Sequence, residues 1–185
     1  MAFIKYSVKS YLTVQDFLNL LKYLVSEEKF PIVSTTYPAN RYASLEYIAY
    51  RWNYMHMYHH AEDMTLCYHY VLSFDLDNEY RQLYNINPKQ LLRQIRILSP
   101  FQGMDLFLAI HRSPRGYLKH VHIIVDSIHA RTGKKTFINM DNLKEELGIL
   151  FYPYNIAFSG YTYMMNNRLL LGNEPPHRLY YHPLY

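Results

Sequence analysis

Two histidines separated by one residue, His120 and His122, are the side chains in this sequence whose spacing best suits shared chemistry. They lie in a β-branched, apolar run that predicts a strand, and residues two apart on a strand leave the same face of a sheet. Both imidazoles can therefore bind one ion. His111 ends the preceding predicted strand and reaches the same point if the two strands pair. Three neutral imidazoles with open coordination positions form a divalent-metal site that can polarise a phosphoryl oxygen.

A structural role for these histidines is the alternative interpretation. The chain has 10 histidines, so a His-x-His pair on a strand also arises by chance. The pair alone favours the structural role, whereas three correctly placed histidines give the two interpretations equal weight. The residues by themselves leave both open.

The elements that must position the histidines follow from periodicity and turn residues. Strands are expected at 2–8, 67–74, 105–111, 120–128 and 155–165, with a strand or extended loop at 29–37. Helices are expected at 13–28, 39–58, 87–98 and 141–147. Gly148 is expected to end the last helix in a left-handed conformation. This order predicts an α+β fold of one domain, residues 1–185, with a central, mainly antiparallel five-stranded sheet flanked by helices.

Composition restricts the class of protein. Half of the 185 residues are hydrophobic and 18% are charged, which excludes collagen-like and disordered chains. A single cysteine, Cys67, favours a reducing compartment, and neither a signal peptide nor an apolar run long enough to span a membrane is present. We therefore expect a cytoplasmic protein. The net charge of +4 suits a polyanionic partner, and 21 tyrosines are more than core packing requires.

The segments around these histidines resemble plasmid mobilisation relaxases of the MobA/VirD2 type, which are HUH endonucleases. The run from His120 to Lys135, preceded by His111, is similar to the third motif of that family. Cys67-Tyr-His-Tyr-Val-Leu-Ser-Phe74 is similar to the second motif, a strand of the form aromatic-His-x-x-x-Ser-Phe. Leu21-Lys-Tyr-Leu-Val-Ser-Glu-Glu-Lys29 is similar to the first motif, in which a tyrosine opens a helical run. The motifs follow the order of the family.

The resemblance implies a relaxase that nicks one DNA strand at a transfer origin, forms a 5′ phosphotyrosine adduct and later rejoins the strand. Tyr23 is then the nucleophile, with His69 and Ser73 supporting the site or touching DNA. The implied metal ligands are His111, His120 and His122. The implied cofactor is Mg²⁺ or Mn²⁺. The implied partners are single-stranded DNA, accessory DNA-binding proteins and a type IV secretion coupling protein, in the cytoplasm of a bacterium that carries the mobile element.

The sequence departs from the family pattern at two places. Many relatives have an aspartate between the first and second ligand histidines, but residues 112–119 contain no carboxylate, which leaves the general base open. Asp126 stands where relatives often have asparagine. By strand alternation it shares the face of His120 and His122, so it either holds one of their tautomers or is a solvated carboxylate at the strand end.

Basic residues and further tyrosines leave the details of DNA contact open. Two basic clusters flank the predicted site and suit single-stranded DNA when aromatic rings lie nearby: Arg112, Arg115 and Lys119, and then Arg131, Lys134 and Lys135. Taken alone, the second cluster is a solvated turn. One alternative is a replication initiator or transposase of the HUH class, whose tyrosine lies downstream, here at Tyr152, Tyr154, Tyr161 or Tyr163. Another is a relaxase-like DNA-binding protein that has lost catalysis.

Overall fold

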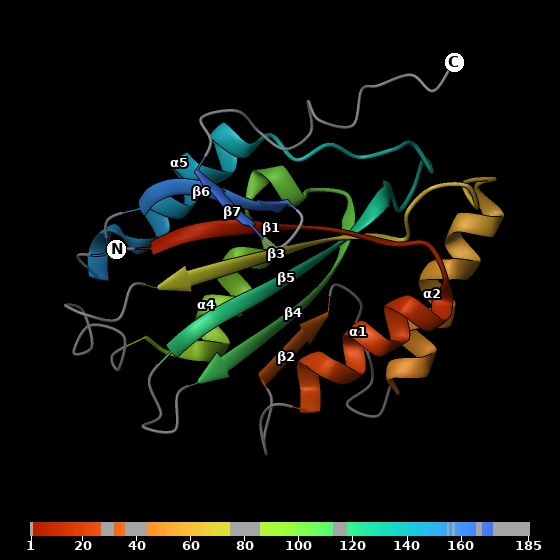
Figure 1. Cartoon of the computed structure of the whole chain (residues 1–185), viewed down its shortest axis with the longest axis horizontal. Coiled ribbons are helices and arrows are strands. Elements are labelled where there is room, and N and C mark those ends of the chain that lie inside the picture. The colour runs from red at the N-terminus through yellow and green to blue at the C-terminus, as the bar shows by residue number, and fades with distance from the viewer. Residues whose placement is uncertain are drawn as a thin grey trace.

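The computed structural model of the protein describes residues 2–26, 32–35, 44–74, 86–112, 118–154, 156, 158–165 and 168–171. These ranges form one sheet with helices on both faces (Figure 1). The strands are β1 (Ala2–Tyr11), β2 (Ile32–Thr35), β3 (Cys67–Phe74), β4 (Met104–Arg112), β5 (Leu118–His129), β6 (Phe158–Met165) and β7 (Arg168–Leu171). The helices are α1 (Val14–Ser26), α2 (Leu45–Tyr58), α4 (Pro88–Arg96) and α5 (Met140–Phe151), with 3-10 turns η1 (Ser99–Phe101) and η2 (Tyr152–Tyr154). The expected α+β class is confirmed.

In the described residues the sheet has seven strands in the order β2-β4-β5-β3-β1-β6-β7. Its centre, β4-β5-β3, is antiparallel, and among the other neighbours only β1 and β6 run parallel. The sheet is therefore mainly antiparallel, but the expected number of five strands is wrong. The edge strand β2 lies within 29–37, where a strand or extended loop was expected, whereas β7 was not expected. A strand as short as β7 forms by pairing with a neighbour and leaves little pattern in the sequence.

Alternation of side chains along the central strands separates two hydrophobic cores. Leu108 of β4 faces the core that α4 and α5 cover, whereas its neighbour Phe107 faces the core that α1 and α2 cover. In the second core the rings of Phe17 and Trp52 stack with their centroids 4.6 Å apart, joining α1 to α2. Both faces of the central strands are thus buried, which holds β4 and β5 rigidly.

Capping side chains determine where the helices begin. The side chain of Asn87 accepts hydrogen bonds at the start of α4, directly before Pro88, as the sequence predicts. Ser44 caps α2 and Asn139 caps α5 in the same way. The expected helix from residue 39 thus begins at Leu45, and residues 39–43 lie outside the described ranges.

Helix α5 does not end at Gly148, contrary to expectation. It continues to Phe151, and the burial of Leu147 and Phe151 in the core carries the helix through the glycine. Among the described glycines, positive φ angles occur instead at Gly103 and Gly133. The expected left-handed end was wrong because the apolar pattern continues for one more turn.

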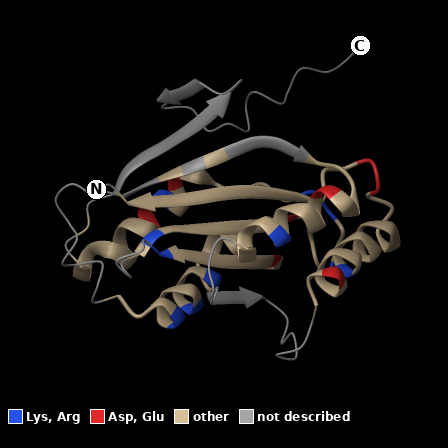
Figure 2. Ribbon diagram, turned by 60° about the horizontal axis from the view of Figure 1, so that its bottom comes forward, with Lys and Arg blue, Asp and Glu red and all other residues tan. Residues whose placement is uncertain are grey.

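Among the described residues, most charged positions are on helices and turns, and the central strands carry few of them (Figure 2). Helix α4 displays three exposed basic residues, Lys89, Arg93 and Arg96, on the side of the sheet opposite α1 and α2. Within the described ranges, no helix is both long enough and apolar enough to cross a membrane.

Candidate metal centre

Three histidines converge where β4 ends and β5 begins. The two strands pair antiparallel with His111 directly opposite His120, and His122 follows on the same face of β5. One ring nitrogen from each of the three lies within 4.8 Å of the others, so the group can hold a metal ion. His111 and His122 are buried and His120 is half-buried. The expectation that the paired strands bring His111 to the His-x-His pair is confirmed.

A backbone carbonyl orients His111. Its Nε2 donates a hydrogen bond to the carbonyl oxygen of Leu24 in α1, at 2.8 Å. Because a carbonyl only accepts, the proton must be on Nε2, which leaves a lone pair on Nδ1. That Nδ1 lies 2.9 Å from Nε2 of His120. Helix α1 therefore sets the tautomer and the direction of one candidate ligand.

A second histidine and a tyrosine orient His122. Nδ1 of His122 lies 2.8 Å from Nε2 of His69 in β3, and Nδ1 of His69 lies 3.4 Å from the hydroxyl of Tyr11 in β1. Nε2 of His122 is buried and has no hydrogen-bond partner. An unsatisfied buried nitrogen is costly, and a bound cation would satisfy it. The donor set therefore fits a metal ion, and His69 supports the site as expected.

Burial keeps the imidazoles of His122 and His69 uncharged. Removal from water lowers the pKa of His122 to about 2, with smaller contributions from His69, His120 and His111. The same cause, followed by repulsion from His120, lowers the pKa of His69 to about 4. A metal ligand must be the neutral imidazole, so His122 is in the required protonation state at neutral pH.

Tyr23 lies on the α1 turn next to the cluster. It directly precedes Leu24, whose carbonyl contacts His111, and its side chain is about half exposed. The downstream tyrosines Tyr152 and Tyr154 belong to η2, and Tyr154 packs against the core on the opposite face of the sheet. The side chains of β6, which carries the other two downstream tyrosines, lie outside the described part. Tyr23 is thus on the same side of the sheet as the histidines.

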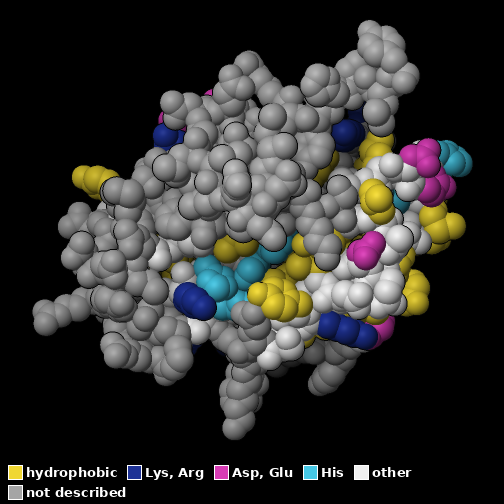
Figure 3. Space-filling model, in the orientation of Figure 1, with side chains coloured by type: hydrophobic (Ala, Val, Ile, Leu, Met, Phe, Trp, Pro, Cys, Tyr) yellow, Lys and Arg dark blue, Asp and Glu magenta, His cyan; other side chains and the backbone are white. Residues whose placement is uncertain are grey.

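Part of the first basic cluster and Ser73 lie beside the histidines. Ser73 of β3 pairs with His120 of β5. Arg112 and Lys119 directly adjoin His111 and His120 in sequence, and both are exposed. Figure 3 shows histidine side chains gathered at the surface over the central strands, with a basic side chain beside them. Arg115 lies outside the described ranges.

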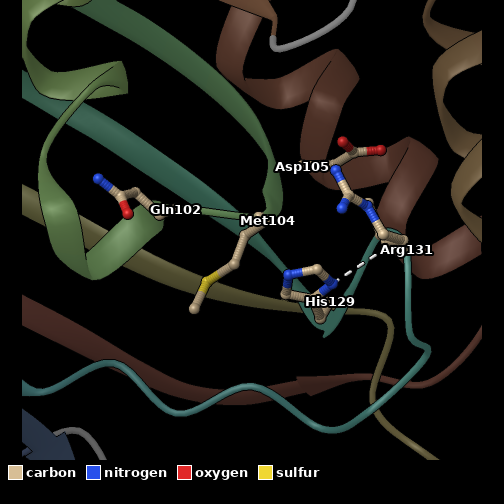
Figure 4. A pocket seen from close by; sticks show the side chains of 7 residues that line it. Gln102, Met104, Asp105, His129 and Arg131 are labelled. Atoms are coloured by element: carbon tan, nitrogen blue, oxygen red, sulfur yellow. Dashed lines mark hydrogen bonds between the residues drawn. The ribbon is translucent and has the colours of Figure 1, made fainter.

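The second basic cluster is far from the histidines, contrary to expectation. Arg131, Lys134 and Lys135 follow the opposite end of β5, and the seven residue steps of strand from His122 to His129 span roughly 23 Å. Arg131 lines an open concavity of about 710 Å³ together with Asp105 and His129. Its backbone N–H donates to Nδ1 of His129 at 3.2 Å (Figure 4). The expected contact of this turn with DNA stays a prediction, and that contact would lie at the end of β5 remote from the histidines.

Asp126 holds an imidazole, but not that of a candidate ligand. Its Oδ1 lies 2.8 Å from Nε2 of His56 in α2, and both side chains are 1% exposed. Nδ1 of His56 lies 3.2 Å from the carbonyl oxygen of Ala61, so both ring nitrogens of His56 have partners. The expected interaction of Asp126 with the site and the alternative of a solvated carboxylate are both wrong. The pair instead joins α2 to β5.

Sequence reasoning missed three contributions to the site and its surroundings: the Tyr11 hydroxyl, the Leu24 carbonyl and the His56 side chain. Tyr11 and Leu24 carry no local signal because they act through contacts between distant segments. For His56, the available signal was a histidine at an apolar position of its helix. A buried histidine at such a position needs a hydrogen-bond partner.

Comparison of the chain with protein-family models, with curated proteins and with solved structures finds no match in any of the three. The geometry of the histidine cluster and the motif resemblance thus carry the functional interpretation.

Proposed function

We propose that this protein is a metal-dependent DNA relaxase that nicks and rejoins one strand with Tyr23 as nucleophile. The observation that carries the proposal is the convergence of three histidines around the partnerless Nε2 of His122, next to the helical turn that holds Tyr23. Tyrosine phenols, neutral imidazoles and a divalent ion are together sufficient for phosphodiester transfer.

His111, His120 and His122 would hold the metal ion, which polarises a phosphate oxygen and offsets the charge that develops during transfer. Imidazole nitrogens suit transition metals, whereas Mg²⁺ prefers oxygen ligands. The donor set therefore favours Mn²⁺ over Mg²⁺. The contacts from Leu24 and His69 keep the ligand rings in place before the ion arrives.

In the proposed reaction the phenolic oxygen of Tyr23 attacks the scissile phosphorus and the bond from phosphorus to the 3′ oxygen breaks. The 3′ oxygen leaves as a hydroxyl, taking up a proton in place of the one that the phenol loses to water. The 5′ phosphate is then esterified to tyrosine, which conserves the bond for the reverse reaction. Tyr23 is sufficiently exposed to meet a macromolecular substrate.

Single-stranded DNA at a transfer origin is the proposed substrate. The support is the motif resemblance, together with the exposed cations Arg112 and Lys119 beside the candidate ligands. Cations at this position would pair with the phosphates that flank the scissile bond. Action on a mobile element in the bacterial cytoplasm, with accessory DNA-binding proteins and a type IV secretion coupling protein, belongs to the same proposal.

A replication initiator or transposase with a downstream tyrosine is the second candidate. Tyr154 of η2 packs against the core on the opposite face of the sheet. This position disfavours a nucleophile in η2, because its side chain would have to reach across the sheet to the histidines. Tyr161 and Tyr163 of β6 remain candidate nucleophiles, which mapping of the adduct tests. A DNA-binding protein without catalysis is the third outcome that the test distinguishes.

The deciding experiment incubates the protein and Mn²⁺ with labelled single-stranded oligonucleotides that tile the DNA around its gene. We expect a covalent adduct on one oligonucleotide, mapped by mass spectrometry to Tyr23. Tyr23→Phe should abolish the adduct while leaving DNA affinity almost unchanged, and Tyr50→Phe is the matched control that should retain it. An adduct on Tyr161 or Tyr163 would establish the second candidate, and binding without any adduct would establish the third.

A further inference from the structure

The outward face of α2 is composed almost entirely of aromatic residues. Six residues of this helix are exposed: Glu46, Tyr47, Tyr50, Tyr54, Met57 and Tyr58. The four tyrosines are between 57% and 65% exposed. Spacings of three and four residues place the tyrosines and the methionine in one stripe along the helix. Figure 3 shows hydrophobic side chains projecting from the edge of the molecule where Figure 1 draws α2.

The opposite face of α2 is already buried. Ile48, Ala49 and Trp52 pack in the core with α1, and His56 pairs with Asp126. A helix that covers a core on one side normally presents charged residues on the other side. Apart from Glu46, the exposed residues of α2 are tyrosine or methionine, which is the composition of a helix face that a partner covers.

We propose that the aromatic stripe of α2 is the interface of a symmetric dimer with a second copy of this chain. A tyrosine buries about 150–250 Å² when fully enclosed, so four that are roughly 60% exposed offer on the order of 400–600 Å². A standard interface buries about 800 Å² on each partner. The tyrosines therefore supply about half to three-quarters of that area before any flanking residue is counted.

The order of residues along the stripe is complementary to itself. When two copies of α2 cross antiparallel, with a two-fold axis at the level of residue 52, Tyr50 of one copy faces Tyr54 of the other. Tyr47 then faces Met57 of the second copy, and Glu46 faces Tyr58. The rings of Tyr47, Tyr50 and Tyr54 each meet another ring or a thioether, both favourable contacts, and no like charges are opposed. Antiparallel helices also have opposed dipoles.

The charges around the stripe favour a protein partner over a nucleic acid or a membrane surface. No lysine or arginine is among the six exposed residues, and Glu46 already pairs with Lys22 at 3.1 Å. Two more exposed acidic residues, Glu62 and Asp63, follow the helix. The acidic residues Glu46, Glu62 and Asp63 outnumber the cations Lys22 and Arg51, so the surroundings offer phosphate groups no net attraction. Tyrosine and methionine with few charges are typical of the centre of a protein interface.

The first test measures molar mass by sedimentation equilibrium over a concentration series. We expect the wild-type chain to approach twice the monomer mass, and Tyr50→Glu combined with Tyr54→Glu to return it to the monomer mass with an unchanged circular dichroism spectrum. The matched control is Tyr152→Glu, at a tyrosine 82% exposed outside α2, which should leave the dimer intact. A monomeric wild type, or a dimer that survives the double substitution, would overturn the proposal.

The second test reports the register. Equal amounts of tagged Tyr50→Cys chains and untagged Tyr54→Cys chains are mixed and oxidised. We expect the mixed disulfide to exceed twice the yield of either homodimeric one, which is the ratio of random pairing, because these positions face each other. The native thiol of Cys67 is 1% exposed and does not compete. A mixed yield of no more than twice that of each homodimeric species would rule out the two-fold arrangement. If the wild type is monomeric and the double glutamate variant loses affinity for oligothymidylate, the stripe is a nucleic-acid surface and the proposal is wrong.

Discussion

Different groups orient the imidazole rings of the candidate ligands His111 and His122. Leu24 in α1 orients His111, and His69 in β3 orients His122. The fixed direction of these rings leaves Nε2 of His122 as a buried nitrogen without a partner. This arrangement costs free energy in the metal-free protein, and a bound cation recovers it.

His122→Ala should therefore weaken Mn²⁺ binding by more than roughly 100-fold, since loss of a ligand exceeds the 10–100-fold effect of losing a residue that only orients one. Isothermal titration calorimetry measures the change. His60 is exposed with a φ of 54°, so the control is His60→Asn, because asparagine tolerates that conformation. Equal affinity in wild type and His122→Ala would return the cluster to a structural role.

The buried pair of His56 and Asp126 is a second set of residues whose loss should be costly. His56→Ala would leave the carboxylate of Asp126 buried without its partner, which costs about 3–5 kcal/mol of the free energy of unfolding. Urea denaturation monitored by circular dichroism measures it, with the exposed His60→Asn as the control. A loss below about 1 kcal/mol would show that water or another group replaces the imidazole.

At the scale of elements, the sequence predicts those parts that carry their own pattern. The strand expected at 67–74 is β3 without change, and the Asn87-Pro88 pair starts α4 where a cap and a first-turn proline belong. The local sequence pattern does not predict elements whose extent depends on tertiary contacts. The edge strand β7 depends on β6, and the continuation of α5 beyond Gly148 depends on the burial of Phe151.

The same limit applies to the site. Strand alternation was enough to predict the convergence of His111, His120 and His122, because it needs only the pairing of two neighbouring strands. Alternation also placed Asp126 on the correct face, yet its partner comes from α2 and not from the site. Which groups meet across layers depends on how helices pack, and that information is spread over the whole chain.

Gly148 offers a prediction at this scale. A methyl group added at Gly148 would meet nothing within 4 Å, and the residue lies inside α5, so Gly148→Ala should stabilise the protein by about 0.5–1 kcal/mol. Thermal and urea unfolding measure the gain. Gly103→Ala is the opposite control, because its φ is +77° and its Cβ would lie 2.1 Å from the ring of His129. If both variants are destabilised, the helix at Gly148 is shorter than described.

At the scale of the molecule, the histidines sit between the sheet and α1, where the second core excludes water. The pKa of His122 falls to about 2 and that of His69 to about 4, while both would titrate near 6.5 in the unfolded chain. Above that value neither histidine is protonated in either state. Below it, the unfolded chain binds protons that the folded protein does not, so the free energy of unfolding falls as the pH falls.

In the metal-free protein, each of the two histidines should lower the free energy of unfolding by on the order of 2 kcal/mol between pH 7 and pH 5. Urea unfolding at the two pH values in a chelator measures the difference. His69→Gln combined with His122→Gln should reduce it substantially, because glutamine does not titrate. If the double variant keeps the whole pH dependence, the carboxylates cause the acid sensitivity and the histidines do not.

The parallel pairing of β1 with β6 also affects biosynthesis. Ala2 pairs with Phe158 and Tyr6 with Tyr163, so one long edge of β1 stays open until more than 150 residues have left the ribosome. The other edge of β1 stays unpaired until β3 has been synthesised. An open strand edge invites pairing with another chain, so translation that stalls before Phe158 would expose an aggregation-prone intermediate. The nascent chain therefore gains most from a chaperone during the interval in which the centre of the sheet has formed but β6 has not.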